Sequence, residues 1–114
     1  MKLRNVVDEL SLSVRSASER LDVEVTGGYA SDLLSCVMAK AQEGNIWVTL
    51  QAHLNIVAVA ALLQLAGIIV TEGACVDEAT LSKARQESVP ILTTPLTTFA
   101  VVARLAALGV EGSA

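Results

Sequence analysis

Two short apolar segments, separated by one helix-length segment, constrain the fold of this chain more than any other feature. Residues 46–48 and 68–70 are apolar at every position, so strands formed by them would be apolar on both faces. Strands of that kind are typical of a parallel sheet covered by helices on both sides. Residues 55–65 lie between them with a helical apolar pattern, which predicts a right-handed strand–helix–strand unit.

The rest of the chain continues this alternation of strands and helices. We expect strands at about residues 12–14, 23–25, 46–50, 68–71 and 91–93, and helices at about 3–10, 33–44, 55–65, 78–87 and 98–108. The expected helix caps are Ser31 or Asp32, Asn55, Asp77, and Thr97 or Thr98. The sequence therefore predicts an α/β fold with three layers, α/β/α, around a mostly parallel sheet of about five strands. We expect a single domain over residues 1–114, with a loose tail at residues 111–114.

The composition requires a core that is largely aliphatic. Hydrophobic residues make up 53% of the 114 residues, but the aromatic residues are Trp47, Tyr29 and Phe99 alone. Val, Leu, Ile and Ala must therefore fill the interior. The net charge is −4, and the Lys and Arg residues are not clustered. This charge distribution argues against nucleic acid and membranes as partners, because binding to nucleic acid or an anionic surface needs a concentrated basic patch.

No segment predicts export, membrane insertion or a disulfide framework. Residues 2–9 form a charged amphipathic segment rather than a signal peptide. The apolar run over residues 54–70 is shorter than the roughly 20 residues of a membrane span, and polar residues and a glycine interrupt it. Cys36 and Cys75 are isolated in the sequence, as expected of one buried thiol and one loop thiol. We therefore expect a cytoplasmic protein.

Ligands of open parallel sheets bind beyond the carboxyl ends of the strands, where the following helices begin. The segments expected at that edge are rich in small hydroxyl side chains and glycine. The candidate ligand-binding residues are Thr26, Gly27, Gly28, Thr49, Gln51, His53, Asn55, Thr71, Glu72, Thr93 and Thr94. Two interpretations stay open, because the same residue types also cap helices and close turns. The set is either a small-ligand pocket or a group of structural caps.

His53, the single histidine, stands directly before the helix expected at residues 55–65. The N-terminal dipole of that helix disfavours the imidazolium cation. A neutral imidazole there could hydrogen-bond a ligand or tie down its own loop. A metal site needs three or four ligands, and no side chain near His53 in sequence has ligand spacing, so we expect no metal and no other cofactor.

Several motifs that would identify an enzyme are missing from the sequence. It contains no G-x-x-x-x-G-K-[ST] loop to hold nucleotide phosphates, no G-x-G-x-x-G segment and no G-x-S-x-G nucleophile elbow. We therefore expect a protein without catalytic activity, and in particular without kinase activity. The alternative is an undescribed enzyme that uses His53.

Four stretches of the sequence carry a family resemblance. They are residues 26–35 (TGGYASDLLS), 47–60 (with T-x-Q-x-H-x-N at 49–55), 67–73 (GIIVTEG) and 89–94 (VPILTT). Together they resemble the DRTGG domain family, especially its small stand-alone members, over about residues 23–109. The chain departs from the family pattern at residues 28–30, where Gly-Tyr-Ala replaces Gly-Asp-Arg, and at residues 71–73, where Thr-Glu-Gly replaces Thr-Gly-Gly. No role of that Asp–Arg pair can therefore be carried over.

The resemblance implies a three-layer α/β/α fold similar to the N-terminal domain of HPr kinase/phosphorylase. It does not imply kinase activity, which in that protein belongs to a P-loop domain. It does imply a regulatory or dimerising role, because related domains accompany CBS-domain pyrophosphatases and phosphotransacetylases. For the stand-alone members the implied context is iron-only hydrogenases and redox signalling.

We expect a regulatory module that forms a homodimer and senses a small anionic metabolite or nucleotide. The alternative is a scaffold that docks onto a partner enzyme and has no ligand of its own. The dimer is expected because the helices at residues 55–65 and 98–108 are apolar around most of their circumference, more than one small domain can bury. The interface is expected to use one or both helices. Val59→Glu, on the first of them, is expected to dissociate the dimer, or to unfold the domain or change nothing if that helix lies elsewhere.

Overall fold

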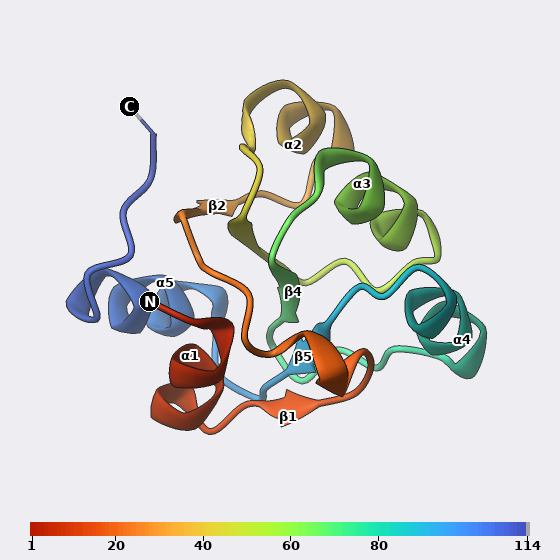
Figure 1. Ribbon diagram of the computed structural model, residues 1–114, viewed down its shortest axis with the longest axis horizontal. Coiled ribbons are helices and arrows are strands. Elements are labelled where there is room, and N and C mark those ends of the chain that lie inside the picture. Colours follow the sequence, from red (N-terminus) through yellow and green to blue (C-terminus); the bar gives the residue numbers. More distant parts are fainter. Residues whose placement is uncertain (114) are drawn as a thin grey trace.

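The computed structural model describes residues 1–113 and contains one five-stranded sheet between helices (Figure 1). The strands are β1 (Ser13–Val14), β2 (Gly27–Ala30), β3 (Asn45–Thr49), β4 (Gly67–Val70) and β5 (Ile91–Thr93). Their spatial order is β1-β5-β4-β3-β2; β2 to β5 are parallel, and β1 pairs with β5 in the antiparallel sense. The predicted α/β class and mostly parallel sheet are confirmed.

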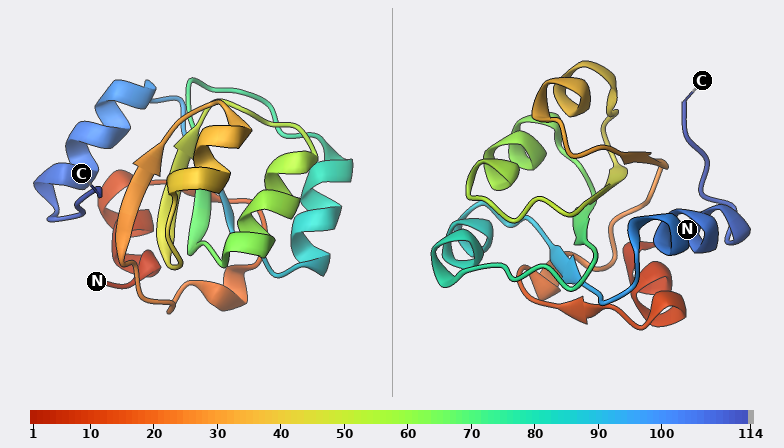
Figure 2. Two further views of the ribbon diagram at one scale, coloured as in Figure 1. Left: turned by 90° about the horizontal axis from the view of Figure 1, so that it is seen from above. Right: turned by 180° about the vertical axis from the view of Figure 1, so that it is seen from behind.

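The helices form one layer on each face of the sheet (Figures 1 and 2). The first layer consists of α2 (Leu34–Lys40), α3 (Asn55–Leu63) and α4 (Glu78–Gln86), and the second of α1 (Leu3–Leu10) and α5 (Thr98–Ala107). A single 3-10 turn, η1 (Ser18–Arg20), follows β1. These are the three layers that the sequence predicts.

The side chains of the central strands point alternately to the two faces of the sheet, and so the core has two halves, one on each face. Successive side chains of a strand point to opposite faces. On β3, Trp47 therefore packs among α2, α3 and α4, whereas Ile46 and Val48 pack among α1 and α5. All three side chains are buried, and Trp47 Nε1 donates a hydrogen bond to Ser31 O at 2.8 Å. A strand that is apolar at every position thus supplies both halves of the core.

The second strand differs from the prediction. The sequence pattern places it at residues 23–25 and ends it at the glycine pair, but β2 begins at Gly27. The segment that contains Val23 and Val25 is extended, and it pairs with the first residues of the chain. Leu3 N–H donates to Val23 O at 3.0 Å, and Val25 N–H donates to Met1 O at 2.8 Å. The pattern therefore reflects pairing with the first residues of the chain rather than with the main sheet.

The position of α3 explains most of its apolar character without a second molecule. It lies between α2 and α4 in its layer (Figure 1), so its flanks are covered as well as its inner face. Val59 is only 7% exposed. The Val59 side chain therefore belongs to the core of the single chain, and of the expected outcomes of Val59→Glu the structure favours unfolding of the domain. Leu62, at 68% exposure, is the large apolar side chain that this helix presents to solvent.

The C-terminal residues pack on the sheet further than a loose tail would. Gly28 N–H donates to Glu111 O at 3.0 Å, which holds Glu111 against β2, while Ala114 lies outside the described residues.

Cys36 is half-buried rather than buried, and Cys75 is exposed; both thiols are free. Within residues 1–113, no helix has both the length and the apolar content needed to cross a bilayer.

Candidate functional site

Side-chain hydrogen bonds close part of the carboxyl edge of the sheet, where the sequence predicts a ligand site. Asp32 follows β2 and lies beside the end of β3, where its Oδ1 accepts from Thr49 Oγ1 (2.8 Å) and from Leu50 N–H (2.9 Å). Gln51 donates from its main chain to Thr49 Oγ1 (3.0 Å) and from its side-chain amide to Asp32 O (3.2 Å). Two candidate residues, Thr49 and Gln51, are thus bound to the protein's own groups.

A second set of hydrogen bonds links the end of β4 to the start of α5. Thr71 is fully buried, and its Oγ1 lies 2.6 Å from Thr98 Oγ1. Glu72 Oε2 accepts from Thr98 N–H at 2.8 Å, at the positive end of the helix dipole. Glu72 also has a φ of +63°, in the left-handed region of a tight turn. The side chains of Thr71 and Glu72 therefore have structural partners in this fold.

At the end of β5, the carboxyl edge of the sheet has a cavity that side-chain hydrogen bonds do not close. A cavity of about 250 Å³ lies there, lined by residues that include Thr93, Thr94, Arg15 and Cys75. Thr94 is buried and its Oγ1 accepts from Leu96 N–H at 3.2 Å, whereas Thr93 is half-buried. Arg15 is exposed and makes no ion pair with any of residues 1–113. This is the part of the predicted edge where candidate residues share a space with a free positive charge.

His53 and Asn55 lie at the start of α3 with exposed side chains. The chain enters this helix through Leu54, whose backbone is already helical, and no side chain caps the helix. Asn55 is thus the first residue of α3 rather than its cap, and that prediction is wrong. The expected Ser31 or Asp32 cap is wrong too, because Leu33 occupies the cap position of α2.

Two of the predicted caps are confirmed. Asp77 Oδ1 accepts from Thr80 N–H at 2.8 Å at the start of α4, and Thr97 Oγ1 accepts from Ala100 N–H at 3.1 Å at the start of α5. The hydrogen bonds from Thr80 hold the pKa of Asp77 below its ordinary value, and the charge of nearby His53 acts in the same direction. Asp77 is exposed, so its carboxylate acts as a helix cap at the surface.

Thr26, Gly27 and Gly28 do not join the other candidates. Because β2 begins at Gly27, they lie at the amino edge of the sheet. A Cβ on Gly27 would lie 2.7 Å from Glu111 O, so glycine is required there by the close approach of the C-terminal segment. Thr26 Oγ1 donates to Glu43 O at 2.7 Å. The glycine pair therefore serves packing and forms no anion-binding turn with the carboxyl-edge residues.

Thr49 and Asp32 form a hydroxyl–carboxylate pair at this edge, but the hydroxyl is not accessible. A hydroxyl nucleophile needs a base within hydrogen-bond reach and access to substrate. The Thr49 hydroxyl has a carboxylate within hydrogen-bond reach, that of Asp32, but the Thr49 side chain is fully buried and no substrate could reach it. Among residues 1–113, no three His, Cys, Asp or Glu side chains converge on a position that could hold a metal ion.

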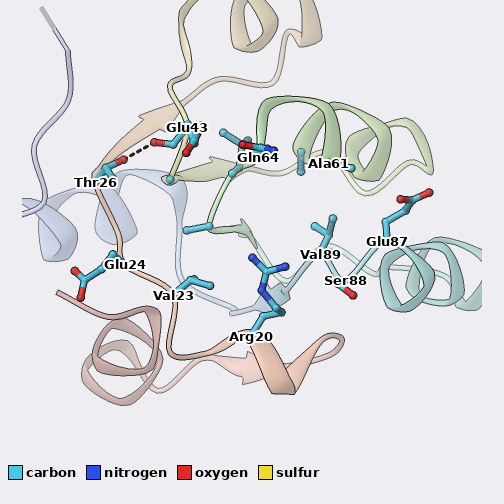
Figure 3. Close-up of a pocket in the computed structure, with 14 residues that line it drawn as sticks. Arg20, Val23, Glu24, Thr26, Glu43, Ala61, Gln64, Glu87, Ser88 and Val89 are labelled. Atoms are coloured by element: carbon cyan, nitrogen blue, oxygen red, sulfur yellow. Dashed lines mark hydrogen bonds between the residues drawn. The ribbon is translucent and has the colours of Figure 1, made fainter.

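A cavity of about 590 Å³ lies at the opposite, amino edge (Figure 3). It is bounded by η1 and the segment before β2, by the loop before β3, and by the C-terminal ends of α3 and α4. Ala60, Ala61, Leu65 and Val89 supply apolar lining. This volume falls within the range of small-molecule sites, roughly 300–1,000 Å³.

Four charged side chains line this cavity, and two of them are already paired. Glu24 binds the N-terminal ammonium of the chain at 3.1 Å, and Glu87 binds Lys83 Nζ at 3.3 Å. Arg20 and Glu43 make no ion pair with any of residues 1–113. The sequence analysis missed this site because its residues are scattered along the chain and only the fold brings them together.

The outer face of α5 is apolar and exposed. Phe99 is 85% exposed and Val102 is 40% exposed, whereas Val101 and Leu105 on the inner face are buried. Between this helix and β2 lies a cavity of about 190 Å³, to which Val102 also contributes. The exposed apolar surface of α5 thus consists of more than one side chain, and contiguous apolar surface of this kind is typical of interaction sites.

Comparison with known proteins places the fold and the family. No curated protein matches the sequence. The structure is similar to the crystal structure of the CBS and DRTGG domains of the regulatory region of Clostridium perfringens pyrophosphatase, complexed with the activator diadenosine tetraphosphate. The TM-score is 0.74 at 21% identity, over 91% of this chain and 45% of that one, so the likeness shows a shared fold. The model of the DRTGG domain matches residues 19–108, which is most of the sequence. This chain therefore belongs to the DRTGG domain family.

Proposed function

We propose that this chain is a non-catalytic regulatory module that acts as a homodimer and communicates with a partner enzyme through its surface. Family membership supports the regulatory role, since the similar DRTGG-containing structure comes from the regulatory region of a pyrophosphatase. The observation that carries the proposal is the exposed apolar face of α5, with Phe99 at 85% exposure. A twofold contact would cover this face on both copies at once.

The energetic argument for the α5 face rests on its aromatic side chain. A buried Phe removes roughly 150–250 Å² from water, and its burial contributes about 1.5–3 kcal/mol. In a twofold contact this contribution occurs twice, once for each copy of Phe99. The neighbouring Val102 and the cavity beside β2 would extend the contact inward. On α3, α2 and α4 cover the flanks, and Leu62 is the large apolar side chain that it exposes, at 68%.

Light scattering coupled to size exclusion tests this proposal with three proteins. The wild-type chain is expected to be a dimer, and Phe99→Glu a folded monomer. Leu62→Glu serves as the matched control, because Leu62 is 68% exposed on α3 in the opposite helical layer, and it is expected to stay dimeric. A monomeric wild type, or a dimer that survives Phe99→Glu, would refute the α5 interface.

A small anion at the end of β5 is a second candidate function, favoured by the unpaired Arg15 at the 250 Å³ cavity. That volume suits an inorganic or acyl phosphate better than a whole dinucleotide. A thermal-shift series with phosphate, acetyl phosphate, ADP and diadenosine tetraphosphate tests it. The stabilisation is expected to vanish in Arg15→Gln and to persist in Arg104→Gln, a control on α5 outside the lining of this cavity. No shift with any probe, or equal shifts in both variants, would remove this candidate.

The partner enzyme proposed here is a cytoplasmic enzyme of redox or energy metabolism, such as an iron-only hydrogenase. The support is the resemblance of the residue 49–55 pattern to stand-alone members of the family. Co-purification of a hydrogenase subunit with the tagged wild-type chain is the expected result. Recovery of no enzyme of this class from a hydrogenase-expressing lysate would contradict it.

A further inference from the structure

We propose that the 590 Å³ cavity at the amino edge binds a small zwitterion of the α-amino acid class, with its carboxylate at Arg20 and its ammonium group at Glu43. The proposal goes beyond the regulatory role above, because it uses neither the α5 face nor the cavity at Arg15. Its basis is a pair of opposite, unpaired charges contributed to one cavity by separate elements (Figure 3).

Arg20 provides the positive charge. It closes η1, and its main chain is fixed there by hydrogen bonds from its N–H to Ala17 O (2.9 Å) and from Val23 N–H to its carbonyl (3.4 Å). Its guanidinium points into the cavity, toward the space between Val23 and Val89 (Figure 3). The planar guanidinium matches a carboxylate in a two-point contact, which makes Arg suited to this role.

Glu43 provides the negative charge from the loop before β3. The loop is held in place because Thr26 Oγ1 donates to Glu43 O (2.7 Å) and Gly44 N–H donates to Gln64 O (2.9 Å). Gln64 ends α3, so the negative end of that helix dipole also lies at this wall. An ammonium group is therefore favoured here and a carboxylate is disfavoured, which fixes the orientation of the ligand.

The remaining lining distinguishes a zwitterion from other small ligands. Glu24 and Glu87 have cationic partners, so the charged side chains left without an ion pair are the exposed Arg20 and Glu43, one cation and one anion. A polyphosphate would meet carboxylates and helix C-termini, and a bare metal ion would find no convergent group of three ligands among residues 1–113. The apolar wall of Ala61 and Val89 suits the hydrocarbon side chain of an amino acid.

Titration of the isotope-labelled full chain, followed by amide NMR, tests this proposal. The probes are α-amino acids with uncharged side chains at millimolar concentration, with leucine as the reference. The analogue with a carboxylate alone is 4-methylpentanoate, and the analogue with an amine alone is isoamylamine. Leucine is expected to shift the amide signals of Ala61, Gln64 and Val89, and each analogue to bind at least about tenfold more weakly, since it lacks one charge-assisted contact.

The variants Arg20→Gln and Glu43→Gln are each expected to weaken binding about tenfold or more. Arg104→Gln is the control, because Arg104 is exposed on α5 and does not line this cavity, and it is expected to bind like the wild type. Three results would overturn the proposal: no amino acid perturbs these signals, an analogue binds as well as leucine, or either cavity variant keeps wild-type affinity. All three are independent of the oligomeric state.

Discussion

Replacing Asp32 tests whether its part of the carboxyl edge is structural. Its carboxylate accepts from Thr49 Oγ1 (2.8 Å) and from Leu50 N–H (2.9 Å), and so ties the segment after β2 to the end of β3. Thr49 is fully buried. In Asp32→Ala the Thr49 hydroxyl would lose this acceptor at a position that water does not reach.

The expected loss of stability follows from these two bonds. A hydrogen bond to a charged group contributes about 1.5–3 kcal/mol, but water can replace the one at Leu50, which is 45% exposed. We therefore expect Asp32→Ala to lower the free energy of unfolding by about 2 kcal/mol. Asp32→Asn keeps an oxygen acceptor without the charge and is expected to lose about 1 kcal/mol.

Urea unfolding followed by Trp47 fluorescence measures this loss, because Trp47 is the single tryptophan and is fully buried. Asp8→Ala is the matched control, an exposed carboxylate on α1 without a side-chain hydrogen bond, with an expected change within about 0.5 kcal/mol. The reasoning is refuted if Asp32→Ala is as stable as the wild type. Loss of a ligand response without loss of stability would instead favour a pocket at this edge.

Three further predictions concern single side chains. Ser16→Ala is expected to cost about 2–3 kcal/mol in urea unfolding, because its buried hydroxyl bonds both a carbonyl and an N–H of residues 89–91; a loss below about 0.5 kcal/mol would contradict this. Thr97→Ala is expected to cost about 1 kcal/mol as a lost cap, whereas Asn55→Ala changes stability by less than about 0.5 kcal/mol; equal losses would restore Asn55 as a cap. The pKa of Asp77 is lowered in the folded state, so its stabilisation is present above its ordinary pKa of 3.8 and is lost as the pH falls through the folded value. The stability difference between wild type and Asp77→Asn should therefore shrink below about pH 4 in urea titrations, and a difference independent of pH would contradict the assignment.

The fold was predictable because its signals are local and strong. Segments around Ile46 and Ile68 that are apolar on both faces require helices on both sides of a parallel sheet, and the structure contains them. Asp77 was predictable as a cap, and the cap of α5 to one of two threonines, because a short polar side chain directly before a helix can accept from the third helical N–H.

The errors arose where a local pattern specifies neither the pairing partner of a segment nor the backbone path into a helix. The alternation at Val23 and Val25 comes from pairing with the N-terminus, and a pattern of period two does not specify its partner. Asn55 looks like a cap, but the chain enters α3 through a helical turn at Leu54. The cavity containing Arg20 joins segments distant in sequence, and no local signal predicts that meeting.

Sedimentation equilibrium of the wild-type chain at micromolar concentration tests most directly whether this DRTGG domain works as a pair through the outer face of α5. The expected mass is twice the 11.9 kDa of the single chain. Phe99→Glu, with Trp47 fluorescence unchanged as proof of folding, is expected to sediment as a single chain. A wild-type protein that sediments at 11.9 kDa would contradict the proposed dimer.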